Sequence, residues 1–213
     1  MRKVSWHPEV LTDRQASVLR ELGSVAKDLD FYLAGGTAVA LYLGHRRSVD
    51  LDWFTSKRVE DPLKLVREFE TSGVPLEIAD FSRGTLHCVA RGIRVSFFEY
   101  LYPLVSPLVT CGTFNCWVAS LEDIACMKLV AIAQRGSKKD FIDVYAICKH
   151  DKPLPGLLEM SKKKFGLKDL SPIIYGLTYF DDADREKTPR MLWKTDWRRI
   201  KSEIKKWVTE VVK

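Results

Sequence analysis

Apolar and polar positions recur along the chain with two different periods, and the change between them lies near residue 120. Before it, short apolar runs of strand length are interspersed with segments of helical period. These runs predict strands at 31–34, 49–54, 76–81, 85–91, 93–100 and 114–118, and helices at 13–28, 37–43 and 62–71. After it the period is helical, and helices are expected at 121–134, 138–149, 156–165 and 196–212.

Strands mixed with helices, followed by a helical half, are typical of an α+β fold. We expect residues 1–119 to form a mixed β-sheet with flanking helices, and residues 120–213 to form a helical region packed on that core. With 213 residues, the chain is long enough to bury a sizeable core as one domain or as two small ones.

Local polar motifs predict where several elements begin and turn. Arg-Gly dipeptides at 83–84 and 91–92 separate three strand-like runs, which favours tight antiparallel turns. Capping boxes, in which the side chains of a Ser or Thr and of the residue three positions later satisfy the first helical N–H groups, are expected at Thr12–Gln15, Ser120–Asp123 and Ser137–Asp140.

Composition excludes several classes of protein. An apolar share of 46% and a charged share of 29% are those of a globular protein rather than a disordered one. The first residues lack the apolar stretch of a signal peptide, and the uncharged run at 31–44 is too short to span a bilayer. Five cysteines without a Cys-x-x-Cys pair fit reduced thiols, and we expect a cytoplasmic protein.

The net charge of +6 is concentrated in the second half of the chain. Residues 1–110 carry 14 basic and 14 acidic side chains, whereas residues 111–213 carry 20 and 14. Two interpretations stay open: these charges are solvated helix faces, or they bind a polyanion such as RNA.

One stretch combines a glycine turn with paired acids. Gly35, Gly36 and Thr37 follow a predicted strand and open a predicted helix, where backbone N–H groups can bind an anion. Asp50 and Asp52 lie on one face of the next strand, and two adjacent carboxylates repel each other unless a cation such as Mg²⁺ lies between them. A phosphate-binding turn beside a metal-binding pair suits nucleotidyl or phosphoryl transfer, although each motif alone is commonly just a turn or an exposed strand edge.

The stretch GGTAVALYLGHRRSVDLDWF resembles the signature of the nucleotidyltransferase superfamily, and more narrowly that of the AbiEii/AbiGii-type nucleotidyltransferase toxin family. A second stretch, LEDIACMKLVAIAQRGSKKDFIDVYAI at 121–147, is similar to that family's Lys-containing helix and following Asp motif. The likeness covers most of residues 30–150. It implies that Lys128 contacts nucleotide phosphates and that Asp140 helps catalysis or positioning.

Basic residues around these motifs are further candidates for nucleotide binding. Lys128, Arg135, Lys139 and Asp143 recur at helical spacing, which either lines one cationic face or forms ordinary surface ion pairs. His45, Arg46 and Arg47 precede the aspartates, where arginine can pair with phosphate in a two-point contact. An exposed loop is the alternative for this tripeptide.

The resemblance also reveals a departure. The superfamily's third carboxylate, which usually activates the attacking hydroxyl, is expected within 92–100, where this chain has Ser96. Glu99 has the opposite strand parity and should face away. His87 is expected to pack within its own strand, and the amphipathic segment 196–212 to pack on the helical region or to contact tRNA or an antitoxin.

These features together predict a Mg²⁺-dependent enzyme that moves a nucleoside monophosphate from an NTP to an acceptor. The expected residues are Asp50 and Asp52 for the metal, Lys128 and Asp140 for catalysis, and Gly35, Gly36, Thr37, Arg46, Arg47 and Arg135 for the nucleotide. The resemblance implies a toxin–antitoxin role with a tRNA end or a protein hydroxyl as acceptor. A small-molecule acceptor, such as an antibiotic, and a non-catalytic nucleotide- or RNA-binding protein are the alternatives.

Overall fold

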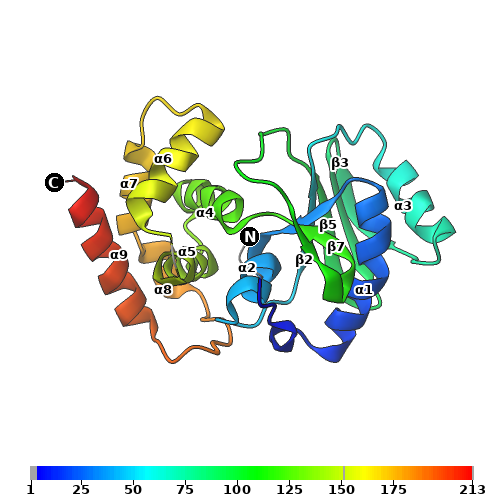
Figure 1. The fold of residues 1–213 in the computed structure, drawn as a ribbon, viewed down its shortest axis with the longest axis horizontal. Coiled ribbons are helices and arrows are strands. Elements are labelled where there is room, and N and C mark those ends of the chain that lie inside the picture. The colour runs from blue at the N-terminus through cyan, green and yellow to red at the C-terminus, as the bar shows by residue number, and fades with distance from the viewer. Residues whose placement is uncertain (1–3, 151, 213) are drawn as a thin grey trace.

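The computed structural model describes residues 4–150 and 152–212, which form a mixed seven-stranded sheet on one side and a group of helices on the other (Figure 1). The α+β class expected from the sequence is confirmed. The strands are β1 (Tyr32–Ala34), β2 (Leu51–Thr55), β3 (Glu77–Ser82), β4 (Thr85–Ala90), β5 (Ile93–Glu99), β6 (Val109–Cys111) and β7 (Cys116–Val118). The α-helices are α1 (Asp13–Asp28), α2 (Gly35–Leu43), α3 (Pro62–Thr71), α4 (Leu121–Arg135), α5 (Lys138–His150), α6 (Leu154–Phe165), α7 (Ser171–Thr178), α8 (Asp181–Arg185) and α9 (Trp197–Val212).

The order of strands across the sheet is β3-β4-β5-β2-β1-β7-β6. Strand β2 pairs antiparallel with β1 but parallel with β5, so the sheet is mixed as predicted. In the register of β2 and β5, Asp52 lies opposite Ser96, and in the register of β4 and β5, Ser96 lies opposite His87. The adjacent strands β4, β5 and β2 therefore bring three polar side chains into one row.

The predicted turns between β3, β4 and β5 are present. Gly84 has a φ of +74°, and Arg91 and Gly92 have φ values of +49° and +79°. Two successive residues with positive φ match the twist of antiparallel strands, so the dipeptide Arg91-Gly92 places β4 against β5. The first capping box is also confirmed, since Thr12 and Gln15 exchange both expected hydrogen bonds at the start of α1.

The later capping boxes differ from the prediction. Ser120 caps α4 by accepting a hydrogen bond from the backbone N–H of Asp123, but the Asp123 carboxylate accepts from the loop before β6 and from Lys164 instead of closing the box. The predicted box at Ser137 and Asp140 is wrong. Glu186, a distant residue, accepts hydrogen bonds from Ser137 Oγ and from the N–H of Lys138, and thereby caps α5.

Among the strands and α-helices of the described residues, β6, α7 and α8 were not predicted. Strand β6 has three residues and follows a segment with two prolines, so it shows no measurable alternation. Helix α7 contains Gly176, which argues against a helix by propensity alone. A Cβ at this glycine would lie 3.1 Å from the Cα of Ala133, so the glycine lets α7 approach α4 closely.

One hydrophobic core runs from the sheet into the helices. Trp53 and Phe97 in the sheet, Leu41 in α2 and Phe141 in α5 are fully buried in the same cluster. Helix α2 packs on both α4 and α5, which joins the two parts. Among the helices of residues 4–150 and 152–212, none combines the length and the apolar character that crossing a bilayer requires. The division near residue 120 stays a prediction.

The contact between α1 and the turn before β7 provides a test of the packing. A Cβ on Gly23 would lie 2.1 Å from the backbone oxygen of Phe114. Gly23→Ala is therefore expected to lower the free energy of unfolding by about 1–3 kcal/mol, because the overpacking exceeds the gain in helix propensity. Thermal denaturation measures this loss.

The matched control is Gly156→Ala in α6, where no heavy atom lies within 4 Å of the added Cβ. This substitution should raise the free energy of unfolding by about 0.5–1 kcal/mol through helix propensity alone. If both variants gained stability, α1 would not approach the turn as closely as the structure has it.

Candidate functional site

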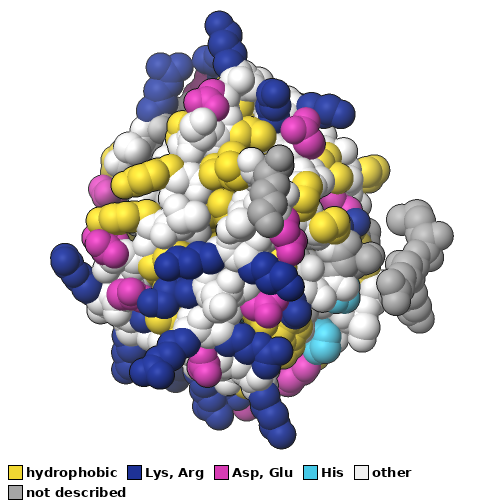
Figure 2. Space-filling model, turned by 90° about the vertical axis from the view of Figure 1, so that its left-hand side faces the viewer, with side chains coloured by type: hydrophobic (Ala, Val, Ile, Leu, Met, Phe, Trp, Pro, Cys, Tyr) yellow, Lys and Arg dark blue, Asp and Glu magenta, His cyan; other side chains and the backbone are white. Residues whose placement is uncertain are grey.

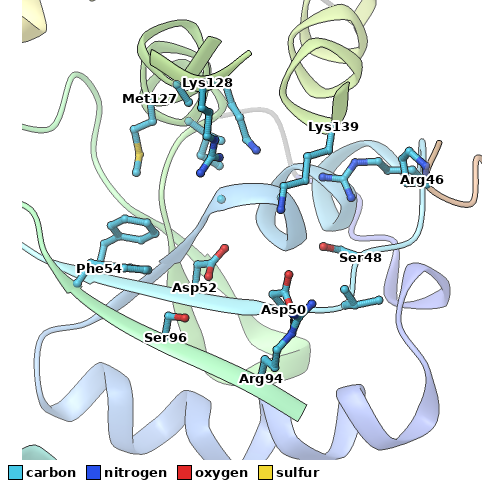
Figure 3. A pocket seen from close by; sticks show the side chains of 18 of the residues that line it. Arg46, Ser48, Asp50, Asp52, Phe54, Arg94, Ser96, Met127, Lys128 and Lys139 are labelled. Carbon is cyan, nitrogen blue, oxygen red and sulfur yellow. Dashed lines mark ion pairs between the residues drawn. The ribbon is translucent and has the colours of Figure 1, made fainter. Parts of the chain in front are cut away.

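A cavity of about 820 Å³ lies between the sheet and the helices α4 and α5 (Figure 3). Strands β2 and β5 form its floor, and α4 and α5 lie above it. The start of α2, the loop between α2 and β2, strand β4 and residues 189–190 complete the lining. The cavity therefore gathers the glycine turn, the paired acids and residues of the stretch 121–147, which we call the basic helix motif. The glycine turn and this motif are far apart in the sequence.

The two glycines at the start of α2 leave room for side chains of the site. Gly35 has a φ of +66°, and a Cβ there would lie 2.7 Å from Oδ2 of Asp52. A Cβ on Gly36 would lie 2.5 Å from Nη2 of Arg46. Ala34 at the N-cap has no side chain to satisfy the first helical N–H groups, so this helix terminus favours an anion.

Asp50 and Asp52 point into the same part of the cavity, as the alternation of a strand requires (Figure 3). Leu51 and Trp53, the neighbours with opposite parity, are fully buried on the other side. Burial raises the pKa of Asp52, and the negative charge of Asp50 raises it further. Two carboxyl groups are thus crowded at this point, as expected from the sequence.

The acid pair has the properties of a cation site. Nε of Arg94 lies 2.7 Å from Oδ1 of Asp50, yet its N–H does not point at that oxygen, and this buried oxygen has no hydrogen bond. Within residues 4–150 and 152–212, no group of three or more His, Cys, Asp or Glu side chains forms a metal cluster. Two carboxylates fit Mg²⁺, which commonly takes one or two protein carboxylates and completes its coordination with substrate phosphates and water.

Opposite the acids, a buried network of ion pairs joins three elements. Asp143 in α5 accepts hydrogen bonds from Nε and Nη2 of Arg46 at 2.7 and 2.8 Å, and from Nε2 of His45 at 2.9 Å. Nζ of Lys128 in α4 lies 2.8 Å from Asp143 and 2.7 Å from Asp140. Arg135 binds the second oxygen of Asp140 at 2.9 Å.

Opposite charge decides the protonation of this network. Burial alone would raise the pKa of Asp143, but Arg46 and Lys128 hold that pKa well below its usual range. Burial would likewise lower the pKa of Lys128, and Asp143 and Asp140 raise it instead. Burial lowers the pKa of His45, which indicates a neutral imidazole that donates its Nε2–H to Asp143.

The segment between α8 and α9 closes one wall of the cavity. The N–H of Arg47 donates to the carbonyl of Arg190 at 2.9 Å, and the backbones of Arg46 and Met191 form an isolated antiparallel β-bridge. The indole Nε1 of Trp193 donates to the carbonyl of Leu43 at 3.1 Å. We call residues 189–193 the closing segment, because it covers the loop that carries His45 and Arg46.

Comparison with protein families explains this combination of features. The model of a family described as "Nucleotidyl transferase AbiEii toxin, Type IV TA system" matches residues 17–210. The chain belongs to this family. Membership of this nucleotidyltransferase family accounts for both the glycine–aspartate motif and the basic helix motif.

Individual relatives agree with this assignment. The chain is 38% identical over 202 residues to the uncharacterized protein aq_aa25 of Aquifex aeolicus (strain VF5), which covers 94% of this chain and 97% of that protein. The crystal structure of JHP933 from Helicobacter pylori is similar with a TM-score of 0.59, at 17% identity, over 97% of this chain and 93% of that one. MenT4, nucleotidyltransferase toxin Rv2826c from Mycobacterium tuberculosis H37Rv, gives a TM-score of 0.58 at 12% identity, over 92% and 84%. The two structures share the fold.

Eight of the ten site residues expected from the sequence line the cavity of this AbiEii-family chain. They are Gly35, Gly36, Arg46, Arg47, Asp50, Asp52, Lys128 and Arg135. Thr37 and Asp140 lie behind the cavity wall. The hydroxyl of Thr37 donates to the backbone carbonyl of Asp50, and Asp140 holds Lys128 and Arg135. These two residues position others and do not face the cavity.

The tripeptide before the aspartates is not an exposed loop. His45 and Arg46 are buried, and their polar groups are directed at Asp143. Lys139, by contrast, reaches into the cavity from α5 and has no partner in the ion pairs found among the described residues (Figure 3). The cationic face of the basic helix motif is thus split into a buried anchoring part and a part open to a ligand.

Several lining residues were missed by the sequence analysis. His87 faces the cavity instead of packing within its strand, and its Nδ1 lies 3.0 Å from Oγ of Ser96. Phe54 and Phe98 stack at 5.0 Å on the floor, and Arg190 enters from the closing segment. Strand alternation carried a signal for three of them, because Phe54 has the parity of Asp52, Phe98 has that of Ser96, and His87 follows from Ser96 once the turn at 91–92 is assigned. Arg190 carried none. Glu99 bonds the N–H of Val59 and does not line the cavity, as predicted.

Removal of the Asp143 carboxylate should destabilise the protein strongly. Asp143→Asn leaves Arg46 and Lys128 without a full countercharge in the core, so the free energy of unfolding should fall by about 3–5 kcal/mol. The control is Glu68→Gln at the exposed pair with Lys64, which should change stability by less than about 0.5 kcal/mol. Urea denaturation measures both.

Wild type and Asp143→Asn should also differ in how their stability depends on pH. Because the folded-state pKa of Asp143 is depressed, its stabilisation is complete above the unfolded pKa of about 3.9 and is lost as the pH falls through the lower folded value. Below about pH 4, wild type should lose stability more steeply than Asp143→Asn. If the free energy of unfolding fell equally steeply below about pH 4 in wild type and in Asp143→Asn, Asp143 would not be the buried anion.

Asp52 should behave in the opposite way. Its raised folded-state pKa means that wild type loses stability as the pH rises above about 4, whereas Asp52→Asn does not. At pH 7 without metal, we expect Asp52→Asn to raise the melting temperature by roughly 2–4 °C. Asp80→Asn on the exposed strand β3 is the control and should leave it unchanged. A lower melting temperature for Asp52→Asn would mean that Asp52 is satisfied by protein groups alone.

Proposed function

We propose that this AbiEii-family nucleotidyltransferase moves a nucleoside monophosphate from an NTP to a hydroxyl of an RNA and releases pyrophosphate. The observation that carries the proposal is the convergence of Asp50 and Asp52 with the free N-terminus of α2 across Gly35. This arrangement pairs a site for a divalent cation with a site for phosphate. Nucleotidyl transfer needs both within a few ångströms of each other.

The phosphates of the NTP have three sets of partners in this proposal. The N–H groups at the start of α2 bind one phosphate, and Gly35 and Gly36 let it approach the backbone. Lys128 and Arg135 approach from α4, with their orientation held by Asp140. Lys139 supplies a further positive charge from α5.

Asp50 and Asp52 would hold Mg²⁺ in this site. The bound ion would supply charge neutralisation to the phosphates and so stabilise the transition state for displacement at the α-phosphorus. Oδ1 of Asp50, which accepts no hydrogen bond, and the raised pKa of Asp52, caused by burial and by the charge of Asp50, both fit such a ligand. Arg46 is anchored on Asp143, so its part is to keep the loop and Gly36 in place.

The apolar end of the cavity suits a nucleobase. Phe54 and Phe98 are stacked there with an interplanar angle of 29°, and Met127 faces them from α4 (Figure 3). Aromatic rings of this kind bind any base through stacking, worth about 1–3 kcal/mol per base. The base of the NTP or the terminal base of the acceptor therefore takes this place in our proposal.

An RNA acceptor is favoured by charge. Arg47, Arg94 and Arg190 line the cavity in addition to the phosphate-binding groups, and residues 111–213 carry the whole net charge of +6. On the outer face of the helical part, Lys and Arg side chains gather over the lower half of the view in Figure 2. The exposed side chains Arg198, Arg199, Lys205 and Lys206 of α9 are on the polar side of that helix. Such surfaces attract a polyanion.

The family context extends the proposal to a toxin that acts on cellular RNA, such as a tRNA end, and is restrained by a cognate antitoxin protein. NTP and RNA meet in the cytoplasm, where we place the protein. Its five cysteines are free thiols, which fits that compartment.

The second candidate is a protein that binds nucleotide or RNA without turnover. Ser96 favours it, because this position faces Asp52 across β2 and β5 and offers no carboxylate to the acceptor hydroxyl. A small-molecule acceptor is the third candidate, since the cavity also admits a drug-sized molecule.

The deciding experiment incubates the protein and Mg²⁺ with each α-labelled NTP and total RNA, or with a panel of aminoglycosides. We expect label in an RNA band together with pyrophosphate. Asp52→Asn should lower the rate by about 10³-fold, since the cation contributes several kcal/mol to the transition state. Asp80→Asn, an exposed acid outside the cavity, should transfer at the wild-type rate.

Isothermal titration of Mg²⁺–NTP into the same variants separates the candidates. Equal affinity in wild type and Asp52→Asn would remove the metal role of that residue. Measurable NTP binding without pyrophosphate release, for every NTP and acceptor, would favour the non-catalytic candidate. Label found on an aminoglycoside and absent from RNA would show that the acceptor is a small molecule.

A further inference from the structure

Transfer to a hydroxyl requires a group that takes the hydroxyl proton, and the cavity offers few such groups. Asp50 and Asp52 face the cation in the proposed function, on which this inference rests. The described residues lining the cavity include several Lys and Arg side chains, which carry protons already at neutral pH. The remaining side chain among them that can accept a proton is the imidazole of His87.

The geometry points to a proton path from the acceptor through Ser96 to His87. Asp52, Ser96 and His87 are register partners on the adjacent strands β2, β5 and β4, and all three line the cavity. Side chains opposite one another on neighbouring strands are roughly 5 Å apart. Ser96 therefore lies between the acid of the metal pair and the imidazole.

The contact between the two residues is close enough for proton transfer. Oγ of Ser96 lies 3.0 Å from Nδ1 of His87, a hydrogen-bond distance between a hydroxyl and an imidazole nitrogen. Phe98 packs edge-on against the imidazole at 5.6 Å and 76°, which restrains the ring. With Nδ1 as acceptor, the Ser96 hydroxyl donates to His87 and leaves its own lone pairs directed toward the cavity.

The step balances as follows. The acceptor oxygen forms a bond to the α-phosphorus while the bond between that phosphorus and the bridging oxygen breaks, and its electron pair leaves with pyrophosphate. The acceptor proton moves to Oγ of Ser96 as the original Ser96 proton moves to Nδ1 of His87. The products are the nucleotidylated acceptor, pyrophosphate and an imidazolium, which returns its proton to solvent. Ser96 is unchanged at the end.

This path gives the serine at position 96 a function. A carboxylate there would accept the proton directly. The serine relays it to a base one strand further away, at the same level of the sheet. The chain thus keeps a proton acceptor without placing a third negative charge beside Asp50 and Asp52, where burial and the charge of Asp50 already raise the pKa of Asp52.

Single-turnover transfer of α-labelled NTP to total RNA tests the path, with Mg²⁺–NTP affinity measured by titration on the same variants. His87→Ala and Ser96→Ala should each lower the transfer rate by about 10²-fold or more and leave the affinity within about threefold. Retained affinity also shows that these variants are folded. The control His150→Ala, at the exposed end of α5, should match wild type.

Rescue distinguishes a proton path from a structural role. Adding Ser96→Asp to His87→Ala supplies a carboxylate beside the acceptor, and should recover the rate at least tenfold. A role in packing alone predicts no such recovery. Intact-mass measurement of wild type with NTP should find Ser96 free of nucleotide.

The outcomes separate this inference from the proposed function. If Asp52→Asn is inactive but His87→Ala transfers within threefold of wild type, or Ser96→Asp gives no rescue, the proton path is wrong and the transferase stands. A nucleotide covalently attached to Ser96 would also overturn the path. If wild type transfers to no acceptor, the proposed function fails and this inference falls with it.

Discussion

The buried carboxylate of Asp143 is the interaction on which the rest of the site depends. It compensates the charge of Arg46 from the loop after α2 and of Lys128 from α4, and it also accepts a hydrogen bond from Nε2 of His45. An arginine and a lysine are stable in a protein core only with such a partner, so the three elements cannot separate without exposing charge to a low-dielectric interior. The network therefore holds α4, α5 and the loop after α2 together.

The two faces of the cavity have opposite electrostatic states. The sheet side carries carboxylates that repel each other, as the raised pKa of Asp52 indicates, whereas the helix side carries cations with matched acids. In the proposed function, a cation bound with the NTP would relieve the repulsion on the sheet side, while Lys139 would offer the phosphates a positive charge that has no partner in the ion pairs among the described residues. On the sheet side, function and stability would then compete.

Features governed by local chemistry were predictable from the sequence. The alternation of a strand places Asp50 and Asp52 together, and the glycine turn follows from the run of residues before it. The register that aligns Asp52 with Ser96 and His87 was not visible, because β2 pairs with a strand that follows two others in the chain. Neither the role of Asp143 nor the closing segment has a local pattern, since their partners lie 97 and 150 positions away.

The closing segment also has a consequence for synthesis. Trp193 and Arg190 complete the wall around a loop made about 150 residues earlier, so a growing chain on the ribosome has the glycine turn and both aspartates long before it has a closed pocket. Of the described residues that line the cavity, those of the closing segment are the last to be synthesised.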